Sequence, residues 1–536
     1  ELGFPAIDYI PVLVKNGRFE ADIRFPEHTE CKKAVLTYVA GKKIQHEDVT
    51  ASLMRKKDNH LQLDRILTVP GEYRLTVQLH DGREDIVIFN VLEPVRDIIE
   101  ARVKYLCDNA YVDEETDEHR HAFQPVSNQG ESLGKLSMIL MKNIVGTRTI
   151  EEIRKVERSA VHYVKPRWFH GGDFQQPKKL YGSFYRIFDF DYIAHLFYLL
   201  SRFRGPELEL NDANTYLLWA GELMIVRFDE MLHDDDRERR ETGLAGVFTI
   251  YLYDLLNDLA NSKLSDAANV HRRLAELVRL FEGKLTRGSS TYAGAITEHY
   301  FDNAGFGPSC EALCLAGEEG HAEKYARLLL ANIGWSNDYR AQNPDRWWEA
   351  LAYMIHSLWG GLVASSTLTA YEHLKSTPLL HAAYRSMMAI FACYDWNIVS
   401  TERKLMRGEA ASTYCVADPN VNKPILSHNR FGQSVFQEDF ELLAGNATGD
   451  DWDMGEEIAA YLNGFGTKTF LYYDDQGQVR CVNGFIEEKN GRRVVTSYAA
   501  YPKAYYFFEE NDSLVAEQDE WIPQIALGEN NRMQRI

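Results

Sequence analysis

The period of the hydrophobic pattern changes twice along the 536-residue chain, and this change limits the folds that the chain can adopt. Residues 1 to about 92 alternate apolar and polar positions in short segments separated by turn signals such as Asp81-Gly82, which is typical of β-strands. From Val95 to about residue 407 apolar residues recur at helical spacing. Alternation returns from about residue 411. This order predicts a multidomain α+β protein.

The three segments suggest three domains. Residues 1–93 predict an immunoglobulin-like β-sandwich of about seven strands. Residues 94–408 contain about twelve candidate helices with long loops between alternate helices, which favours six hairpins closed into an (α/α)6-type toroid. A helical repeat array is the alternative, but no fixed sequence period supports it. Residues 409–536 predict a C-terminal β-rich domain.

Charge and composition narrow the classes of partner. The formal net charge is −20, from 59 Lys and Arg against 79 Asp and Glu, which disfavours nucleic acid and anionic membrane surfaces as partners. An anionic substrate stays open, because a local basic cleft can exist in an acidic protein. No apolar run approaches about 18 residues, so no membrane insertion is expected. Seven cysteines without a CxxC pair indicate neither a disulfide framework nor a zinc knuckle, and we expect no metal or cofactor.

The sequence begins at Glu1 rather than Met. We expect a mature chain from which a secretion signal has been removed, in a secreted or periplasmic protein. A cytoplasmic location is the alternative.

The densest set of chemically versatile side chains lies in residues 163–203, a polar loop with Gly and Pro that becomes a helix. Such a loop would lie at the cleft mouth of a toroid, and so many polar groups are costly to bury without a use. The alternative is an N-cap aspartate followed by an amphipathic helix with tyrosines as packing. The catalytic candidates are His170, Tyr185, Asp189, Asp191, Tyr192 and His195, and the substrate-binding candidates are Lys165, Arg167, Trp168, Tyr181 and Arg186.

Two further clusters add candidates. A Gly-bearing loop at 296–313 offers His299 and Tyr300 for catalysis and Glu298 and Asn303 for binding, unless it only closes a hairpin. Residues 335–361 hold four of the nine tryptophans, and one or two of these are expected to be sugar platforms and the others core. This cluster supplies the binding candidates Asp338, Trp347, Trp348 and Trp359. His119 and His121 alternate without a carboxylate at ligand spacing, which favours a solvated loop over a metal site.

Several widespread catalytic motifs are absent from the sequence. There is no G-x-x-x-x-G-K-[ST], no G-x-G-x-x-G after a strand, no H-E-x-x-H and no G-x-S-x-G. Nucleotide hydrolysis, dinucleotide redox chemistry, zincin proteolysis and α/β-hydrolase chemistry are therefore unsupported.

Four segments in order resemble the six-hairpin carbohydrate-active enzymes: VLEPVRDIIEARVKYLCDN, GFGPSCEALCLAGEEGHAEKYARLLLANIG, RWWEAL and LNGFGTKTFLYY. The resemblance covers most of residues 90–480. It implies an (α/α) toroid with flanking β domains, as in polysaccharide lyases and glycoside hydrolases. The nearest likeness is to bacterial rhamnose–glucuronate lyases that act on arabinogalactan side chains. Because the resemblance lies in helix-hairpin patterns, the site candidates above rest on chemistry alone.

Two enzyme mechanisms fit the candidates. A lyase removes the proton α to a uronate carboxylate and expels the 4-linked sugar, which requires cations or amide donors and an acid and base of the His, Tyr or Lys type. Residues 163–203 offer that set, which favours β-elimination on a uronate-containing, plant-type acidic polysaccharide. The first alternative is a glycoside hydrolase with carboxyl groups about 6.5–9.5 Å apart for inversion. It would pair Asp189 or Asp191 with Glu298, Asp302 or Asp338. The second alternative is a non-catalytic carbohydrate-binding protein.

Overall fold

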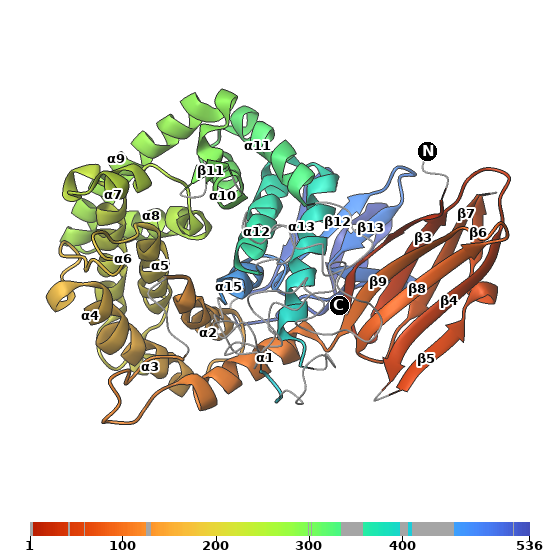
Figure 1. Cartoon of the computed structure of the whole chain (residues 1–536), viewed down its shortest axis with the longest axis horizontal. Coiled ribbons are helices and arrows are strands. Elements are labelled where there is room, and N and C mark those ends of the chain that lie inside the picture. The colour runs from red at the N-terminus through yellow and green to blue at the C-terminus, as the bar shows by residue number, and fades with distance from the viewer. Residues whose placement is uncertain are drawn as a thin grey trace.

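The computed structural model describes residues 4–40, 43–57, 59–124, 130–297, 300–301, 303–333, 357–396, 406–409, 455–517 and 519–536. In Figure 1 the N-terminal residues form β-sheets at the right, the middle of the chain forms a curved array of helices at the left, and the C-terminal residues form further β-strands that lie next to the N-terminal sheets. The predicted order of β, α and β segments is therefore confirmed, and the protein is a multidomain α+β chain. No helix in the described ranges combines the length and the apolar character that crossing a membrane requires.

The N-terminal strands form two sheets that share one apolar core. The first sheet has the order β1 (Ala6–Tyr9), β3 (Arg18–Arg24), β7 (His60–Ile66), β6 (Met54–Lys57). The second has the order β2 (Val12–Val14), β9 (Glu84–Leu92), β8 (Gly71–Leu79), β4 (Cys31–Ala40), β5 (Lys43–Asp48). Phe19 of one sheet stacks on Phe89 of the other, with 4.1 Å between ring centroids. The alternating pattern thus buries one face of each sheet.

The helical region begins at α1, directly after β9. Its α-helices in the described residues are α1 (Val95–Tyr105), α2 (Gly134–Val145), α3 (Ile150–Arg158), α4 (Lys165–Trp168), α5 (Phe188–Leu200), α6 (Ala213–Phe228), α7 (Asp236–Glu241), α8 (Leu252–Asn261), α9 (Ser265–Gly288), α10 (Asn303–Leu315), α11 (Glu319–Asn332), α12 (Ser357–Leu374), α13 (Thr377–Ile390) and α15 (Glu456–Asn463). In Figure 1 they follow one another around an arc, with a short β10–β11 pair (Ile296–Thr297 and Tyr300–Phe301) near α10. The six-hairpin toroid stays a prediction, as do the domain limits at 93 and 408.

Helix α15 lies in a segment for which strands were expected. Its residues Ile458, Ala459, Tyr461 and Leu462 are buried, and the helix packs against α2 and α12. Their spacing along the sequence places them on the faces of a helix that neighbouring helices cover. The helical structure therefore extends beyond residue 408.

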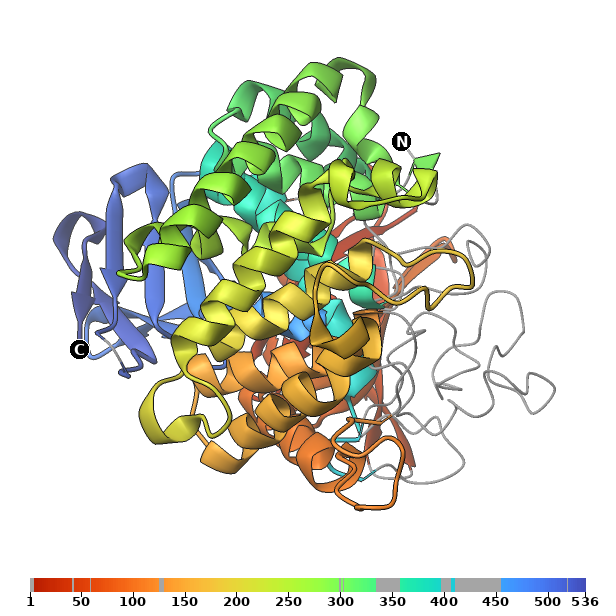
Figure 2. The same cartoon turned by 90° about the vertical axis from the view of Figure 1, so that its left-hand side faces the viewer.

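The C-terminal strands start at Lys468 and form two four-stranded sheets. The first has the order β13 (Val479–Val482), β12 (Lys468–Tyr473), β16 (Ala504–Phe507), β17 (Asp512–Val515). The second has the order β14 (Gly484–Lys489), β15 (Arg492–Ser497), β18 (Gln524–Leu527), β19 (Met533–Arg535). Figure 2 shows these sheets beside the helical array, at the left edge of the view.

Candidate active site

Helix α5 is buried along its whole length yet carries five ionisable side chains, Tyr198 among them. Asp189, Asp191, Tyr192 and His195 are each at most 4% exposed. Residues three positions apart lie on neighbouring parts of one helix face, so positions 189, 192 and 195 form a connected stripe. Burial of such groups is costly, and they concentrate at functional sites. This stripe is our candidate active site.

The carboxylate of Asp189 accepts hydrogen bonds from three segments of the chain. Its Oδ1 accepts a hydrogen bond from the backbone N–H of Gly130 at 2.9 Å, and its Oδ2 accepts from Tyr181 OH at 3.2 Å and Trp168 Nε1 at 3.4 Å. Burial raises the pKa of Asp189, while the guanidinium of Arg186 opposes this effect. The predicted residues Trp168, Tyr181, Arg186 and Asp189 therefore meet in one cluster. Asp189 does not act as a helix N-cap, because Ile187 occupies that position.

Arg186 is paired within the protein. Its two terminal nitrogens donate to the carboxylate of Glu131 at 2.9 and 3.0 Å, and one of them also lies 3.3 Å from Asp189 Oδ1. Both Arg186 and Glu131 are nearly fully buried. Sequence reasoning missed Glu131, which lies in the 3₁₀ turn Gly130–Leu133, and no local motif marks it.

His195 is oriented by two neighbours. Its Nδ1 is hydrogen-bonded to Oε1 of Glu456, the first residue of α15, and its ring stacks on Tyr251 with 4.6 Å between centroids and 3° between planes. A carboxylate at Nδ1 favours the tautomer with the proton on that nitrogen, which leaves Nε2 able to accept a proton. Glu456 is fully buried. Neither Glu456 nor Tyr251 was predicted.

The hydroxyl of Tyr192 is buried and has no hydrogen-bond partner among the described residues. Burial raises the pKa of this phenol well above its ordinary value, and the charges of Glu131 and Glu456 raise it further, so it is protonated. A Cβ on Gly130 would lie 2.9 Å from Tyr192 Cδ2 and 2.7 Å from the Asp189 Cα. Glycine at position 130 thus allows the backbone to pack against α5 at this point.

Asp191 forms a separate ion pair. Its Oδ1 accepts from Arg227 Nε at 2.9 Å, and Arg227 also donates to the carbonyl oxygens of Thr242 and Leu244 at 2.8 and 2.7 Å. Both charged side chains are fully buried. Burial raises the pKa of Asp191 to about 6. The pair ties α5 to α6 and to the segment before α8.

The side chains of the other predicted residues in 163–187 contact residues outside the α5 stripe or are exposed. Tyr185 OH is hydrogen-bonded to His233 Nδ1 at 2.8 Å. His170 is exposed in a 3₁₀ turn. The Nζ of Lys165 lies 3.6 Å from the centroid of a Trp219 ring, and the guanidinium of Arg167 lies against the rings of Tyr163 and Trp168. The expected loop at 163–168 is helical, because it continues α3 through a π-helical turn into α4.

The remaining candidates cannot be placed in the site. Glu298, His299, Asp302, Asp338, Trp347 and Trp348 lie outside the described residues. Tyr300, Asn303 and Trp359 are described by their backbone only, in β11, α10 and α12. Over the described ranges no group of three or more His, Cys, Asp or Glu side chains is arranged to hold a metal ion.

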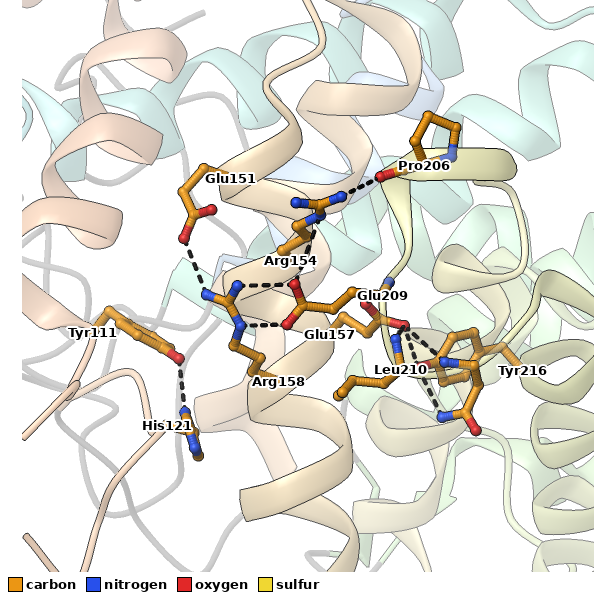
Figure 3. Close-up of polar contacts among 11 residues, drawn as sticks. Tyr111, His121, Glu151, Arg154, Glu157, Arg158, Pro206, Glu209, Leu210 and Tyr216 are labelled. Carbon is orange, nitrogen blue, oxygen red and sulfur yellow. Dashed lines mark hydrogen bonds and ion pairs between the residues drawn. The ribbon is translucent and has the colours of Figure 1, made fainter. Parts of the chain in front are cut away.

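A polar network next to α3 is distinct from the α5 stripe (Figure 3). The buried carboxylate of Glu157 accepts from the backbone N–H groups of residues 209, 210 and 211 at 2.7, 3.1 and 3.3 Å and from Tyr216 OH at 2.6 Å. On the other side of α3, Tyr111 OH is 2.8 Å from Nδ1 of His121, whose backbone has a positive φ of 70°. The network around Glu157 anchors the loop before α6.

The overall arrangement has a counterpart among solved structures. A polysaccharide lyase superposes on this chain with a TM-score of 0.60 over 77% of this chain. The chain is similar in fold to a polysaccharide lyase. The two sequences are 12% identical, and the chain spans 60% of the length of that protein. No protein-family model and no curated protein sequence matches the chain.

Proposed function

We propose that the protein is a polysaccharide lyase that cleaves a uronate-containing acidic polysaccharide by β-elimination. One observation carries this proposal. A single buried helix face presents an imidazole that is hydrogen-bonded to a carboxylate and a phenol whose hydroxyl has no hydrogen-bond partner among the described residues. His195 with Glu456 supplies the first group and Tyr192 the second. The similarity in fold to a polysaccharide lyase supports the same reaction class.

The proposed step uses these groups as base and acid. Nε2 of His195 takes the proton from C5 of the uronate, and the negative charge of Glu456 stabilises the imidazolium that forms. A C4–C5 double bond forms as the C4–O bond breaks. Tyr192 gives its proton to the leaving oxygen, which suits a phenol that burial keeps protonated.

The charge that develops on the uronate carboxylate needs a partner. Arg186 is the cation of the site, and its charge is shared with Glu131 and Asp189. Burial raises the pKa of Asp189, which favours the neutral form of this carboxyl and reduces its repulsion of a substrate carboxylate. We assign these two groups to neutralisation of the substrate carboxylate. Lys165 and Arg167, which the sequence offered for the same role, contact aromatic rings instead.

The finer features of the proposal follow from the sequence resemblance. The substrate would be a plant-type glycan such as arabinogalactan, cleaved at a rhamnose-bearing glucuronate. The helices would close into the six-hairpin toroid, and the enzyme would be secreted or periplasmic.

The test is to incubate the protein with a panel of uronate-bearing polysaccharides, gum arabic among them. The ultraviolet absorbance of the new conjugated double bond is followed together with the number of reducing ends. We expect both to rise, and both to be abolished in Tyr192→Phe and His195→Asn. Reducing ends without absorbance would exclude elimination and indicate hydrolysis.

Hydrolysis is the second candidate because of one observation. Arg186 is hydrogen-bonded to both Asp189 and Glu131, so the two carboxyl groups lie near each other. Burial favours the protonated form of Asp189, which the general acid of a glycosidase requires. In that case Asp189→Asn would abolish turnover while Tyr192→Phe would keep it. Binding of the glycan without any turnover would instead support a non-catalytic carbohydrate-binding protein.

A further inference from the structure

A groove of about 710 Å³ lies where three parts of the chain meet. Its walls come from β1, β3 and β7 of the N-terminal sandwich, from α13, and from β12, β13 and β14 of the C-terminal sheets. Figure 1 shows α13, β12 and β13 beside β3. The volume is within the range of small-molecule sites, roughly 300–1,000 Å³. None of the α5 stripe residues lines the groove, so it is a separate feature of the molecule.

Aromatic side chains line this groove. Tyr472, Phe485 and Tyr498 are all half-buried, so part of each ring faces the groove or solvent. Tyr472 meets His381 edge to face at 5.1 Å, and Phe485 lies 5.5 Å from Tyr498. Such ring contacts hold the orientation of the aromatic side chains, so that their apolar faces can stack on a ligand. The tyrosine hydroxyls can form hydrogen bonds at the ring edges. This combination suits the faces and hydroxyl groups of a sugar ring.

The charges of the groove argue against an anionic ligand. Among the described lining residues each arginine already has a carboxylate partner. Arg480 Nε donates to Asp474 at 2.8 Å, Arg18 Nε donates to Asp64 at 2.7 Å, and Arg385 lies 3.5 Å from Asp8. Carboxylates also outnumber the arginines along the groove, and two of them, Glu20 and Asp22, are exposed, so a uronate or phosphate would be repelled there.

Carboxylate acceptors remain available on the strand β3. The side chains of Glu20 and Asp22 are 42% and 45% exposed and line the groove. Glu20 pairs with Arg18 at 3.4 Å and Asp22 with His60 at 3.1 Å, and a carboxylate has further lone pairs that can accept hydrogen bonds. Carboxylates with open lone pairs bind neutral hydroxyl groups well.

One buried acceptor at the groove also lacks a donor. Asn483 is 2% exposed, and its Nδ2 donates to the carbonyl oxygens of Phe465 and Lys468 at 2.6 and 2.7 Å. Its Oδ1 is buried without a hydrogen-bond partner among the described residues. An unsatisfied buried acceptor costs roughly 1–3 kcal/mol and is uncommon in folded proteins. Asn483 also lines the groove, so this acceptor lies in the wall that a ligand would contact.

We propose that this groove binds a neutral oligosaccharide, with Tyr472 and Phe485 as ring platforms and Glu20 and Asp22 as hydroxyl acceptors. The site is separate from the α5 stripe, and the proposal does not depend on the reaction proposed there.

The test is affinity electrophoresis of the full chain in gels that contain galactan, arabinan, xylan or polygalacturonate. We expect at least one of the three neutral glycans to retard the protein. In Glu20→Gln/Asp22→Asn/Tyr472→Ala the affinity should fall at least about tenfold. The matched control is Glu47→Gln, since Glu47 is also 42% exposed and paired with an arginine of the same sandwich but does not line the groove. This control should bind as the unchanged protein does.

The proposal is overturned if no neutral glycan retards the chain, if only polygalacturonate does, or if the triple variant binds as tightly as the unchanged protein. Should circular dichroism show that the triple variant is unfolded, the isosteric Glu20→Gln variant decides, with at least a threefold loss expected. His195→Asn should keep the neutral-glycan retardation. Failure of the catalytic proposal would therefore be visible separately from failure of this one.

Discussion

His195 of α5 and Glu456 of α15 are hydrogen-bonded through the imidazole Nδ1, although 261 residues separate them in the chain. The imidazole also lies nearly parallel to the ring of Tyr251. These two contacts fix both the tautomer and the tilt of the ring. They make His195 a base with a defined direction of attack if the proposed elimination is correct.

Glu456→Gln tests this relationship. The glutamine amide can present its NH₂ group to Nδ1, which would move the ring proton to Nε2 and leave no base at the substrate. We expect kcat on a cleavable polyuronate to fall by about 10²–10⁴-fold with little change in KM, by analogy with loss of the orienting carboxylate in other dyads. Steady-state kinetics that show a raised KM and an unchanged kcat would contradict the positioning role.

Tyr192→Phe should separate stability from activity. Because the Tyr192 hydroxyl has no partner among the described residues, its removal should leave the free energy of unfolding unchanged or raise it by up to about 1 kcal/mol. Turnover should fall at least about 10²-fold, since the proton donor is lost. The matched control is Tyr216→Phe, because Tyr216 is equally buried but donates to Glu157 at 2.6 Å. This control should lose about 1–3 kcal/mol. Urea unfolding and initial rates measure both effects, and a destabilised Tyr192→Phe would show that the hydroxyl is structural.

Asp191 should make stability depend on pH. Its pKa is raised from 3.8 to about 6 in the folded chain because burial disfavours the charged form. The folded state therefore holds a proton that the unfolded state loses between about pH 4 and pH 6. Stabilisation from this group is complete below about pH 4 and declines, by at most about 3 kcal/mol, as the pH rises to about 6. Asp191→Asn removes this titration. In urea unfolding at several pH values, the stability of the unchanged protein minus that of the variant should fall across this window. A constant or rising difference would contradict the expectation.

Glu157 should be a major determinant of stability outside the site. Glu157→Ala leaves the backbone N–H groups of residues 209–211 and the Tyr216 hydroxyl without their acceptor. We expect a loss of about 3 kcal/mol or more in the free energy of unfolding. Glu151→Ala is the control on the same helix, because Glu151 is 57% exposed in its pair with Arg158 and such pairs contribute at most about 1 kcal/mol. Equal effects of the two variants in urea unfolding would show that Glu157 is not the anchor described here.

The order of β, α and β segments could be predicted from residue pattern alone, because hydrophobic period is a local property of the chain. It also singled out residues 163–203, and within them Trp168, Tyr181, Arg186 and Asp189, which the structure brings together. The spacing of Tyr192 and His195 placed both side chains on adjoining parts of one helix face.

Which of these side chains have hydrogen-bond partners depends on contacts between elements that are far apart in the chain. Arg227, Tyr251 and Glu456 reach α5, and Glu131 reaches Arg186 just before it, from positions 36 to 261 residues away in the chain. No local pattern encodes such pairings, because they arise from the packing of helices that are distant in sequence. The same packing made residues 163–168 of the expected loop helical and buried the candidate site. Burial is the physical cause of the raised pKa values of Asp189 and Tyr192, and it was beyond the reach of residue spacing.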